Sequence, residues 1–484
     1  MKMSERRRLH PIAGILTFLK RLRELILPVI FFVIIGGVGE NRFIDILYFS
    51  LLGAVLISML VGGILQWYRY SYRVENGELR IEYGVFIRKK RFIPLERIQK
   101  IDVSAGIIHR LFGLVKLQVE TAGGGTEAEA VLSAIKVDEA NQLREVLKGE
   151  KVSAEQDLSE DSTDLVQYKL SLTELVIAAS TSGGIGIVIS ALFAFISQFD
   201  ELIPYQRIFG RFNQQFVNVG TILLIAAVIV GVIFISWIIG IIMVGFKYAN
   251  FTVTKHDRNL IITRGLIEKR QLTIPLSRIQ AIRIVENPVR QLLGYVTVCV
   301  ESAGGTAEKG EEDFSSLLFP LIRRNRLGLI LEFVPGYMLD VPLNQPPKRS
   351  RIRYIIRAVL PVVAFVLLVS FYFQGWAYAS ILLIPIAWWL GYLTYCAAGW
   401  GLNEDQLILR YRIFSKVTIL HKKRRIQAIA ETQSFFQRKK QLMTIKSSIR
   451  SSATGKSFKV RDLEEEHCGE IIQWFSGNSK KESD

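Results

Sequence analysis

The stretch RFIPLERIQKIDVSAGIIHRLFGLVKLQVETAGGG, residues 91–125, decides the fold of this chain, because closely similar stretches occur twice more. The second, QLTIPLSRIQAIRIVENPVRQLLGYVTVCVESAGG, covers residues 271–305 and keeps the spacing between its glutamine and its glycine. The third, TILHKKRRIQAIAETQSFFQRKKQLMTIKSS, covers residues 418–448, lacks the IPL string and has Gln441 in place of the glycine. The chain is therefore built from three copies of one unit.

Within a copy, the residue pattern is that of strands followed by a helix. The segment GELRIEYGVFIRKKRFIPL, residues 77–95, alternates apolar and polar residues and begins at the turn signal Asn76-Gly77. The segment KVDEANQLREVL, residues 136–147, places its apolar residues on one helical face. This order predicts three α+β domains, each a small β-sandwich or barrel capped by a C-terminal helix.

Six apolar stretches predict membrane helices arranged as three hairpins, because a bilayer core needs about 20 apolar residues in a helix. Basic residues are abundant in the arm before the first stretch, whereas the outer ends of the hairpins hold only Arg42, Arg207 and Arg211. The positive-inside rule then predicts a multi-pass protein of the cell membrane with six helices and with both termini in the cytoplasm. The stretches are residues 25–39, 46–66, 175–197, 216–246, 354–373 and 376–397.

These patterns divide the chain into nine segments. Each of the three predicted hairpins is followed by a predicted soluble domain, and the two connections between repeats differ in composition, one acidic and one rich in proline and arginine. The segments are a basic arm (1–24), hairpin one (25–66), domain one (67–148), an acidic linker (149–171), hairpin two (172–246), domain two (247–335), a Pro/Arg linker (336–353), hairpin three (354–397) and a divergent domain three (398–478).

The composition argues against several function classes. The three cysteines and five histidines are scattered, so no metal-ligand spacing is present and no cofactor is expected. No paired-carboxylate, Ser/His/Asp or Cys/His arrangement is recognisable, and the string ATGKS at 453–457 lacks the first glycine of a phosphate-binding loop. The net charge of +17 would suit nucleic acid, but aromatic residues do not interleave with the basic runs. We expect neither enzymatic activity nor nucleic-acid binding.

The strings IPLERIQ, RLFGLVKLQVETAGG and DEANQLREVL resemble the bacterial pleckstrin-homology (PH) domains, once catalogued as a domain of unknown function. Three such domains, each behind a two-helix hairpin, resemble the triple-repeat, YdbT-like membrane proteins of that family. The resemblance is strong over copies one and two and weak over copy three. It implies a PH-like fold, a multi-pass membrane location and no known enzymatic activity, and it supplies no functional residues.

The repeated string RIQ either stabilises the fold or contacts a partner. Strand alternation places its glutamine on the same face as core residues, and a buried amide needs hydrogen-bond partners. We therefore interpret the string as a structural marker with largely buried glutamines, and a contact to a partner peptide is the alternative. The marker residues are Arg97, Gln99, Arg278, Gln280, Arg425 and Gln427.

Two basic runs are candidate contacts to anionic lipid. Headgroup attraction contributes about 1 kcal/mol for each basic residue near the surface. The alternative is a solvated surface whose charge reflects the positive-inside bias. The first run is Arg88, Lys89, Lys90 and Arg91, and the second is Lys422, Lys423, Arg424 and Arg425.

The expected function is that of a scaffold or assembly factor at the inner leaflet, linked to envelope maintenance or tolerance to membrane-active agents. An exporter or channel gated by the soluble domains is an alternative, although only Arg357 is charged within the predicted helix interiors. A regulator that recruits its partner by strand addition is another. The expected partners are the lipid bilayer, anionic lipids, and either a second copy of the chain or a paired membrane protein of the same family.

Overall fold

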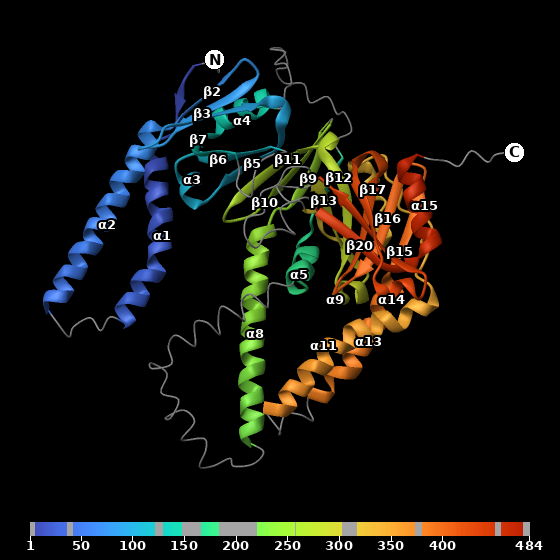
Figure 1. Cartoon of the computed structure of the whole chain (residues 1–484). Helices are drawn as coiled ribbons and strands as arrows, with labels where there is room; N and C mark the ends of the chain where they lie inside the picture. Colours follow the sequence, from blue (N-terminus) through green and yellow to red (C-terminus); the bar gives the residue numbers. More distant parts are fainter. Residues whose placement is uncertain are drawn as a thin grey trace.

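The structure is a computed structural model that describes residues 5–35, 42–121, 129–147, 166–182, 220–256, 258–302, 317–372, 380–450 and 456–477. Three β-rich domains follow one another in the order of the chain, and the long helices leave them on one common side (Figure 1). This arrangement separates the molecule into a helical part and a continuous β part.

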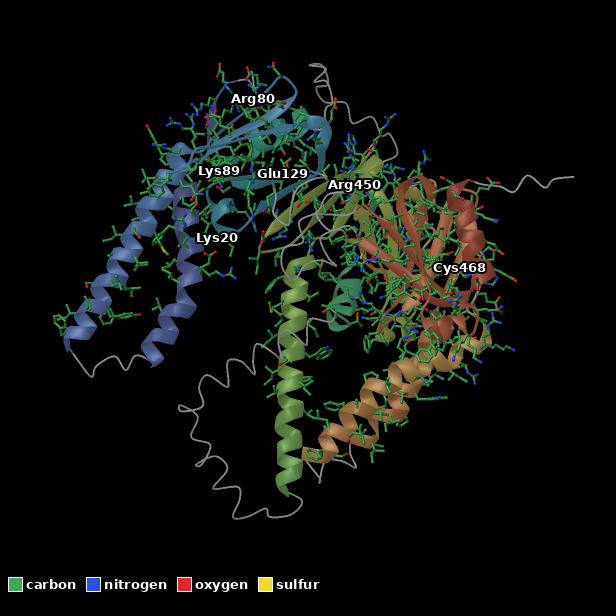
Figure 2. All side chains as sticks on the ribbon, viewed as in Figure 1. Lys20, Arg80, Lys89, Glu129, Arg450 and Cys468 are labelled. Atoms are coloured by element: carbon green, nitrogen blue, oxygen red, sulfur yellow. The ribbon has the colours of Figure 1, made fainter. Side chains whose placement is uncertain are left out.

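Three helices are long and apolar enough to cross a membrane in the described part of the chain, namely Ile46–Arg69, Val230–Tyr248 and Lys348–Phe371. The expected six are not all found there. The apolar helix Leu383–Ala397 is shorter, and the helix α1 (Ile12–Ile35) carries charged residues such as Lys20 (Figure 2). Part of the expected stretches 175–197 and 216–246 lies outside the described residues. The hairpin helices are α1 (Ile12–Ile35), α2 (Arg42–Arg69), α5 (Leu172–Ser180), α8 (Gly220–Tyr248), α11 (Arg351–Tyr372) and α13 (Leu383–Ala397).

Each copy then forms two three-stranded layers joined by one turn of 3-10 helix. The first copy contains β2 (Ser71–Glu75), β3 (Glu78–Tyr83), β4 (Lys89–Pro94), η1 (Leu95–Arg97), β5 (Ile98–Ala105), α3 (Ile107–Leu111), β6 (Leu114–Thr121) and β7 (Ala130–Lys136). The second contains β9 (Thr252–His256), β10 (Asn259–Arg264), β11 (Lys269–Pro275), η2 (Leu276–Arg278), β12 (Ile279–Glu286), α9 (Pro288–Leu292), β13 (Tyr295–Ser302) and β14 (Leu317–Arg323). The third contains β15 (Gly399–Asn403), β16 (Gln406–Arg412), β17 (Lys416–Lys422), η6 (Lys423–Arg425), β18 (Ile426–Thr432), α14 (Phe435–Arg438), β19 (Leu442–Ile449) and β20 (Lys456–Glu464).

The expected C-terminal helix is present in copies one and three, as α4 (Val137–Leu147) and α15 (Glu465–Ser476). For copy two the expectation is wrong, since only η3 (Arg324–Arg326) and the short α10 (Leu329–Phe333) follow β14. Gly328 stands at the start of α10, and Pro335 and Gly336, with φ of 80° at the glycine, prevent its extension. The chain covers the core instead with Phe333 and Tyr337, which are both buried.

A short segment before each hairpin pairs with the first strand after it. In copy one β1 (Arg7–Arg8) pairs with β2, and in copy two β8 (Gln167–Lys169) pairs with β9. In copy three Asn344 forms a single bridge with Trp400 of β15. Both ends of every hairpin are therefore attached to the same sheet, and hence to the same side of the molecule.

The sheets of neighbouring copies are continuous. Strand β5 pairs with β11 in a seven-stranded sheet, and β12 pairs with β17 in a six-stranded sheet, both antiparallel. The cores merge as well, since Ile408 and Leu420 of copy three pack in the core of copy two. The soluble part is therefore three domains joined by backbone hydrogen bonds (Figure 1).

The glycine missing from copy three leaves measurable strain. Gly113 and Gly294 have φ of 64° and 72°, and Gln441 is held at 53° in the corresponding turn. A side chain in this left-handed region costs about 1 kcal/mol.

We expect Gln441→Gly to stabilise the full chain by about 1 kcal/mol, measured as a higher midpoint of thermal unfolding in detergent. Lys440→Gly, one residue earlier at negative φ, should lower that midpoint, and a lower midpoint for Gln441→Gly would contradict the argument.

Candidate membrane-facing site

The repeated string occupies a corner between the two layers of each copy. Its leucine and arginine belong to the 3-10 turns η1 and η2, and the corresponding turn in copy three is η6. The strand after the turn is shifted in register between Ile98 and Lys100, and at the equivalent place in the other copies. Gln99, Gln280 and Gln427 are thus the extra residues of three β-bulges. The string forms a bent corner, which accounts for its recurrence.

The arginine of the string connects one copy to the copy before it. Arg278 Nη2 donates a hydrogen bond to the carbonyl of Glu96 at 2.5 Å, and Arg425 Nη2 donates to the carbonyl of Ser277 at 2.6 Å. Glu96 and Ser277 hold the same place in η1 and η2. Arg97, in the first copy, makes no such hydrogen bond within the described residues.

The burial of the glutamine at the bulge differs between copies. Gln280 is 6% exposed and donates to the carbonyl of Arg278 at 2.9 Å. Gln427 is exposed, so the expected burial is wrong for copy three. The reason is position, because β12 is covered by β17 whereas β18 lies at the edge of its sheet. The side chain of Gln99 lies outside the described residues.

The β-hairpin tips lie at the ends of the membrane helices in all three copies. Gly265 and Leu266 donate backbone hydrogen bonds to the carbonyls of Ala249 and Phe246, at the end of α8. In copy one, the ring of Tyr83 beside the tip stacks on Tyr70 just after α2. In copy three the tip residue Ile413 lines a cavity together with α11 and α13. The tips therefore occupy the side of the domains from which the helices leave.

This side is apolar in every copy, because the tips and the short helices expose large hydrophobic side chains. Phe86 is fully exposed, and Leu292 of α9 is 88% exposed. Single exposed hydrophobic residues are common, but a patch repeated in three copies marks a candidate contact surface, and it lies next to the long apolar helices. We call these residues the apolar rim: Phe86, Ile87, Ile107, Leu111, Phe112, Leu266, Ile267, Val289, Leu292, Leu293, Ile413, Phe414, Phe435 and Phe436.

The two basic runs lie at opposite ends of equivalent strands. Arg88–Arg91 begins at the tip of copy one and is exposed, and Lys89 lies close to the domain end of α2 (Figure 2). Lys422–Arg425 begins at the last residue of β17, a seven-residue strand of roughly 23 Å, and continues through η6. Both runs contact protein. In the first, Arg88 pairs with Glu82 and Arg91 donates to the Glu129 carbonyl at 2.6 Å. In the second, Lys422 lies over the ring of Tyr337 at 4.7 Å and Lys423 over Trp474 at 5.2 Å. Only the first run is placed beside the rim.

A further group of basic residues, separate from the two runs and not identified from the sequence, lies within the rim. It lines a cavity of about 410 Å³ between α11, α13, the end of β16 and β20. The cationic side chains of the lining are Arg357, Arg412, Lys459 and Arg461, and no acidic residue is part of this lining among the described residues. The four residues come from three segments far apart in the chain, so no run of basic letters marks them.

Arg412 is the least solvated cation of this cavity. It is 7% exposed, one terminal nitrogen donates to Gln291 Oε1, and its Nε is buried without a hydrogen-bond partner within the described residues. Burial lowers the pKa of its guanidinium. A buried donor without an acceptor costs about 1–3 kcal/mol, so an anionic oxygen in the cavity would be favoured.

Among the described residues, no group of three or more His, Cys, Asp or Glu side chains is placed to hold a metal ion.

His421, the residue before the second basic run, is fully buried and packs against Phe458. Its burial lowers its pKa to about 3, which keeps the ring neutral. His421 therefore belongs to the core, although it directly precedes the second basic run.

Comparison with known proteins gives concordant results. The profile described as "Bacterial PH domain" matches residues 29–151, 191–328 and 355–479. UPF0699 transmembrane protein YdbT of Bacillus subtilis (strain 168) is 41% identical over 98% of this chain and 99% of its own length. UPF0699 transmembrane protein YdbS of the same organism is 26% identical over 26% of this chain and 81% of its own length. Each matched range begins inside one of the three predicted hairpins and continues through most or all of the domain that follows it.

Proposed function

Since this chain belongs to the bacterial PH-domain family, as a membrane-associated member with three repeats, we propose that it is a non-enzymatic scaffold whose domains lie against the inner leaflet and bind anionic headgroups. The observation that carries this proposal is the apolar rim, which recurs in all three copies at the ends of the membrane helices. Scaffolds of this kind would serve envelope maintenance or tolerance to membrane-active agents.

The rim supports lipid contact because its exposed side chains would otherwise face water. Burying apolar surface contributes about 25 cal/mol per Å². The hairpins hold each domain at the bilayer, so rim insertion needs little affinity of its own. The cavity beside α11 and α13 adds charge selectivity, since basic pockets between membrane helices on the cytoplasmic side bind anionic headgroups. Arg88–Arg91 would add a further basic contact at the tip of copy one.

The proposed topology has six membrane helices with both termini and all three domains in the cytoplasm. Attachment of both ends of each hairpin to one sheet supports domains on a single side. The charge asymmetry of the sequence supports the cytoplasmic side. Transport is less well supported, because charged residues are rare within the described membrane helices.

Rim insertion is tested by comparing the two ends of β16 in the full chain. Phe414→Cys at the rim and Glu404→Cys at the far turn each receive an environment-sensitive fluorophore, in a Cys396→Ser background, after reconstitution in vesicles. We expect a quencher carried on lipid chains to quench the probe at 414, and aqueous iodide to quench the probe at 404. Equal access of iodide to both probes would refute lipid contact by the rim.

A second experiment in the same vesicles tests selectivity for anionic headgroups. Lys459→Gln with Arg461→Gln should weaken binding of a fluorescent anionic lipid about tenfold or more, since each charge contributes about 1 kcal/mol. Binding of a zwitterionic analogue should not change. The matched control is Arg424→Gln, which removes an exposed charge at the far end of β17. Equal losses for the control and the double variant would rule out the cavity as the site.

A further inference from the structure

The outer edges of β4 and β18 have no partner strand within the described residues. The first sheet runs β1-β2-β3-β4 and ends at β4, and the last sheet runs β18-β19-β20 and begins at β18. In the other copies, the strands equivalent to these are paired, β11 with β5 and β17 with β12. Within the described residues, β4 and β18 therefore lack the neighbouring strand that their equivalents have.

The two internal junctions have the same register. Lys269 faces Ala105 in one junction, and Lys416 faces Glu286 in the other. In both pairs the lysine lies eleven residues before the RIQ glutamine of its own copy. The residue that it faces lies six residues after the RIQ glutamine of the preceding copy. Applied to β18 and β4, this register places Lys89 opposite Thr432, Lys90 opposite Glu431, Arg91 opposite Ala430 and Phe92 opposite Ile429.

Charge and burial at the two free edges fit this register. Lys90 would face Glu431, as Lys416 faces Glu286 across the second junction with an Nζ–Oε1 distance of 2.8 Å. Opposite charges on directly facing residues stabilise strand pairs. The lysines of β4 disfavour pairing of β4 with itself, because like charges would then meet.

Phe92 is the apolar residue that the free edge leaves uncovered. It is 56% exposed, whereas its equivalents Thr273 and Leu420 in the paired strands are 2% and 1% exposed. On the other edge Ala428 is exposed, and its equivalent Ala281 is fully buried. Both edges thus expose positions that the internal junctions bury.

Two arginines outside the strands complete the pattern. Arg97 is the counterpart of Arg278 and Arg425, which contact the corner carbonyl of the preceding copy. Arg438 is the counterpart of Arg110, whose Nη1 donates to the Leu266 carbonyl at the next copy's tip at 2.9 Å. Neither Arg97 nor Arg438 makes a side-chain hydrogen bond or ion pair within the described residues. Each of these three counterparts donates a hydrogen bond across a junction between copies.

We propose that β18 of one copy of this chain pairs antiparallel with β4 of a second copy, in the register of the internal junctions. Lys90 then faces Glu431, Arg97 donates to the Arg424 carbonyl, and Arg438 reaches the tip of the next copy. Because the junction repeats the internal ones, all hairpins remain on one side of the assembly. The contact is head-to-tail, so copies add until a ring closes or an open row forms.

The test is disulfide crosslinking of the full chain in native membranes, in a Cys396→Ser background with two tags. A copy with Arg91→Cys should crosslink to a copy with Ala430→Cys and give a product of two 54.9 kDa chains that carries both tags. Two copies with Arg91→Cys should not crosslink, since that would require pairing of like edges. Absence of the mixed product, or an equal yield from the like-edge pair, would overturn the proposal.

Charge reversal tests the register without disturbing the fold, because the exchanged residues are exposed. Lys90→Glu or Glu431→Lys alone should lower the mixed crosslink about three- to tenfold, and combining them on the two partners should restore it. The matched control, Lys136→Glu, changes an exposed lysine of β7 and should have no effect. Absence of rescue would reject this register, and a crosslink to a smaller, single-domain protein in place of the second chain would reject the proposed occupant.

Discussion

Asp462→Ala should destabilise the third domain by about 3 kcal/mol, because it removes a buried carboxylate on which three donors converge. The Asp462 carboxylate is fully buried and receives hydrogen bonds at 2.9 Å from Arg353, Arg357 and Gln437. The two arginines belong to α11, so the carboxylate joins the third hairpin to its domain. Without it, both guanidinium groups would be left at the domain surface without an anion.

Cys468 provides a local measurement of this effect, since it is fully buried in the third domain (Figure 2). In the Asp462→Ala chain, with Cys396 replaced by serine, the rate of thiol labelling at Cys468 should rise at least about a hundredfold. The matched control is Asp405→Ala, which removes an exposed acid that lies 3.8 Å from the exposed Arg424. Equal labelling rates for the two variants would contradict the role assigned to Asp462.

Arg290→Met should destabilise the second domain by about 3 kcal/mol, because it leaves several acceptors without a donor. Arg290 is 8% exposed, and it donates at 2.9 Å both to Thr181 Oγ1 and to the Ala178 carbonyl at the end of α5. Burial lowers its pKa to about 10, so the guanidinium remains charged at neutral pH. The contact therefore joins α9 to the second hairpin in a way comparable to Asp462 in copy three.

Cys299 reports on this domain, because it lies in β13 and is 2% exposed. Arg290→Met should accelerate labelling of Cys299 about a hundredfold and leave Cys468 much less affected. Arg323→Met, at an exposed arginine that ends β14, should leave both rates unchanged. If Cys468 responded more strongly than Cys299, the assignment of Arg290 to the second domain would be wrong.

The sequence predicted the features that depend on side-chain patterns. The three copies were found through their shared strings, and the turn at Asn76-Gly77 has the positive φ values expected of it, 54° and 73°. The helices that end copies one and three follow from the apolar faces of their sequences. The family assignment rests on the same strings and agrees with the profile match.

The sequence did not predict the features that depend on the backbone or on distant residues. Pairing of β5 with β11 uses main-chain groups, which every sequence supplies, so no residue pattern predicts it. Strand β1 is only two residues long, too short for any alternation to appear. The basic cavity combines Arg357, Arg412 and Lys459, which only the fold brings together. The run Lys422–Arg425 is visible in the sequence, yet its contacts with Tyr337 and Trp474 are not.

In the proposed topology, the strands that flank each hairpin would couple membrane insertion to domain folding. Strand β8 would pair with β9 only after the intervening chain had crossed the bilayer and come back, because the two strands must meet in one compartment. A hairpin that stalls after one crossing would leave its first strand on the wrong side and its sheet incomplete. The three pairings would then act as checkpoints of that topology during biogenesis, since a misinserted chain would expose an unfinished domain to proteolysis.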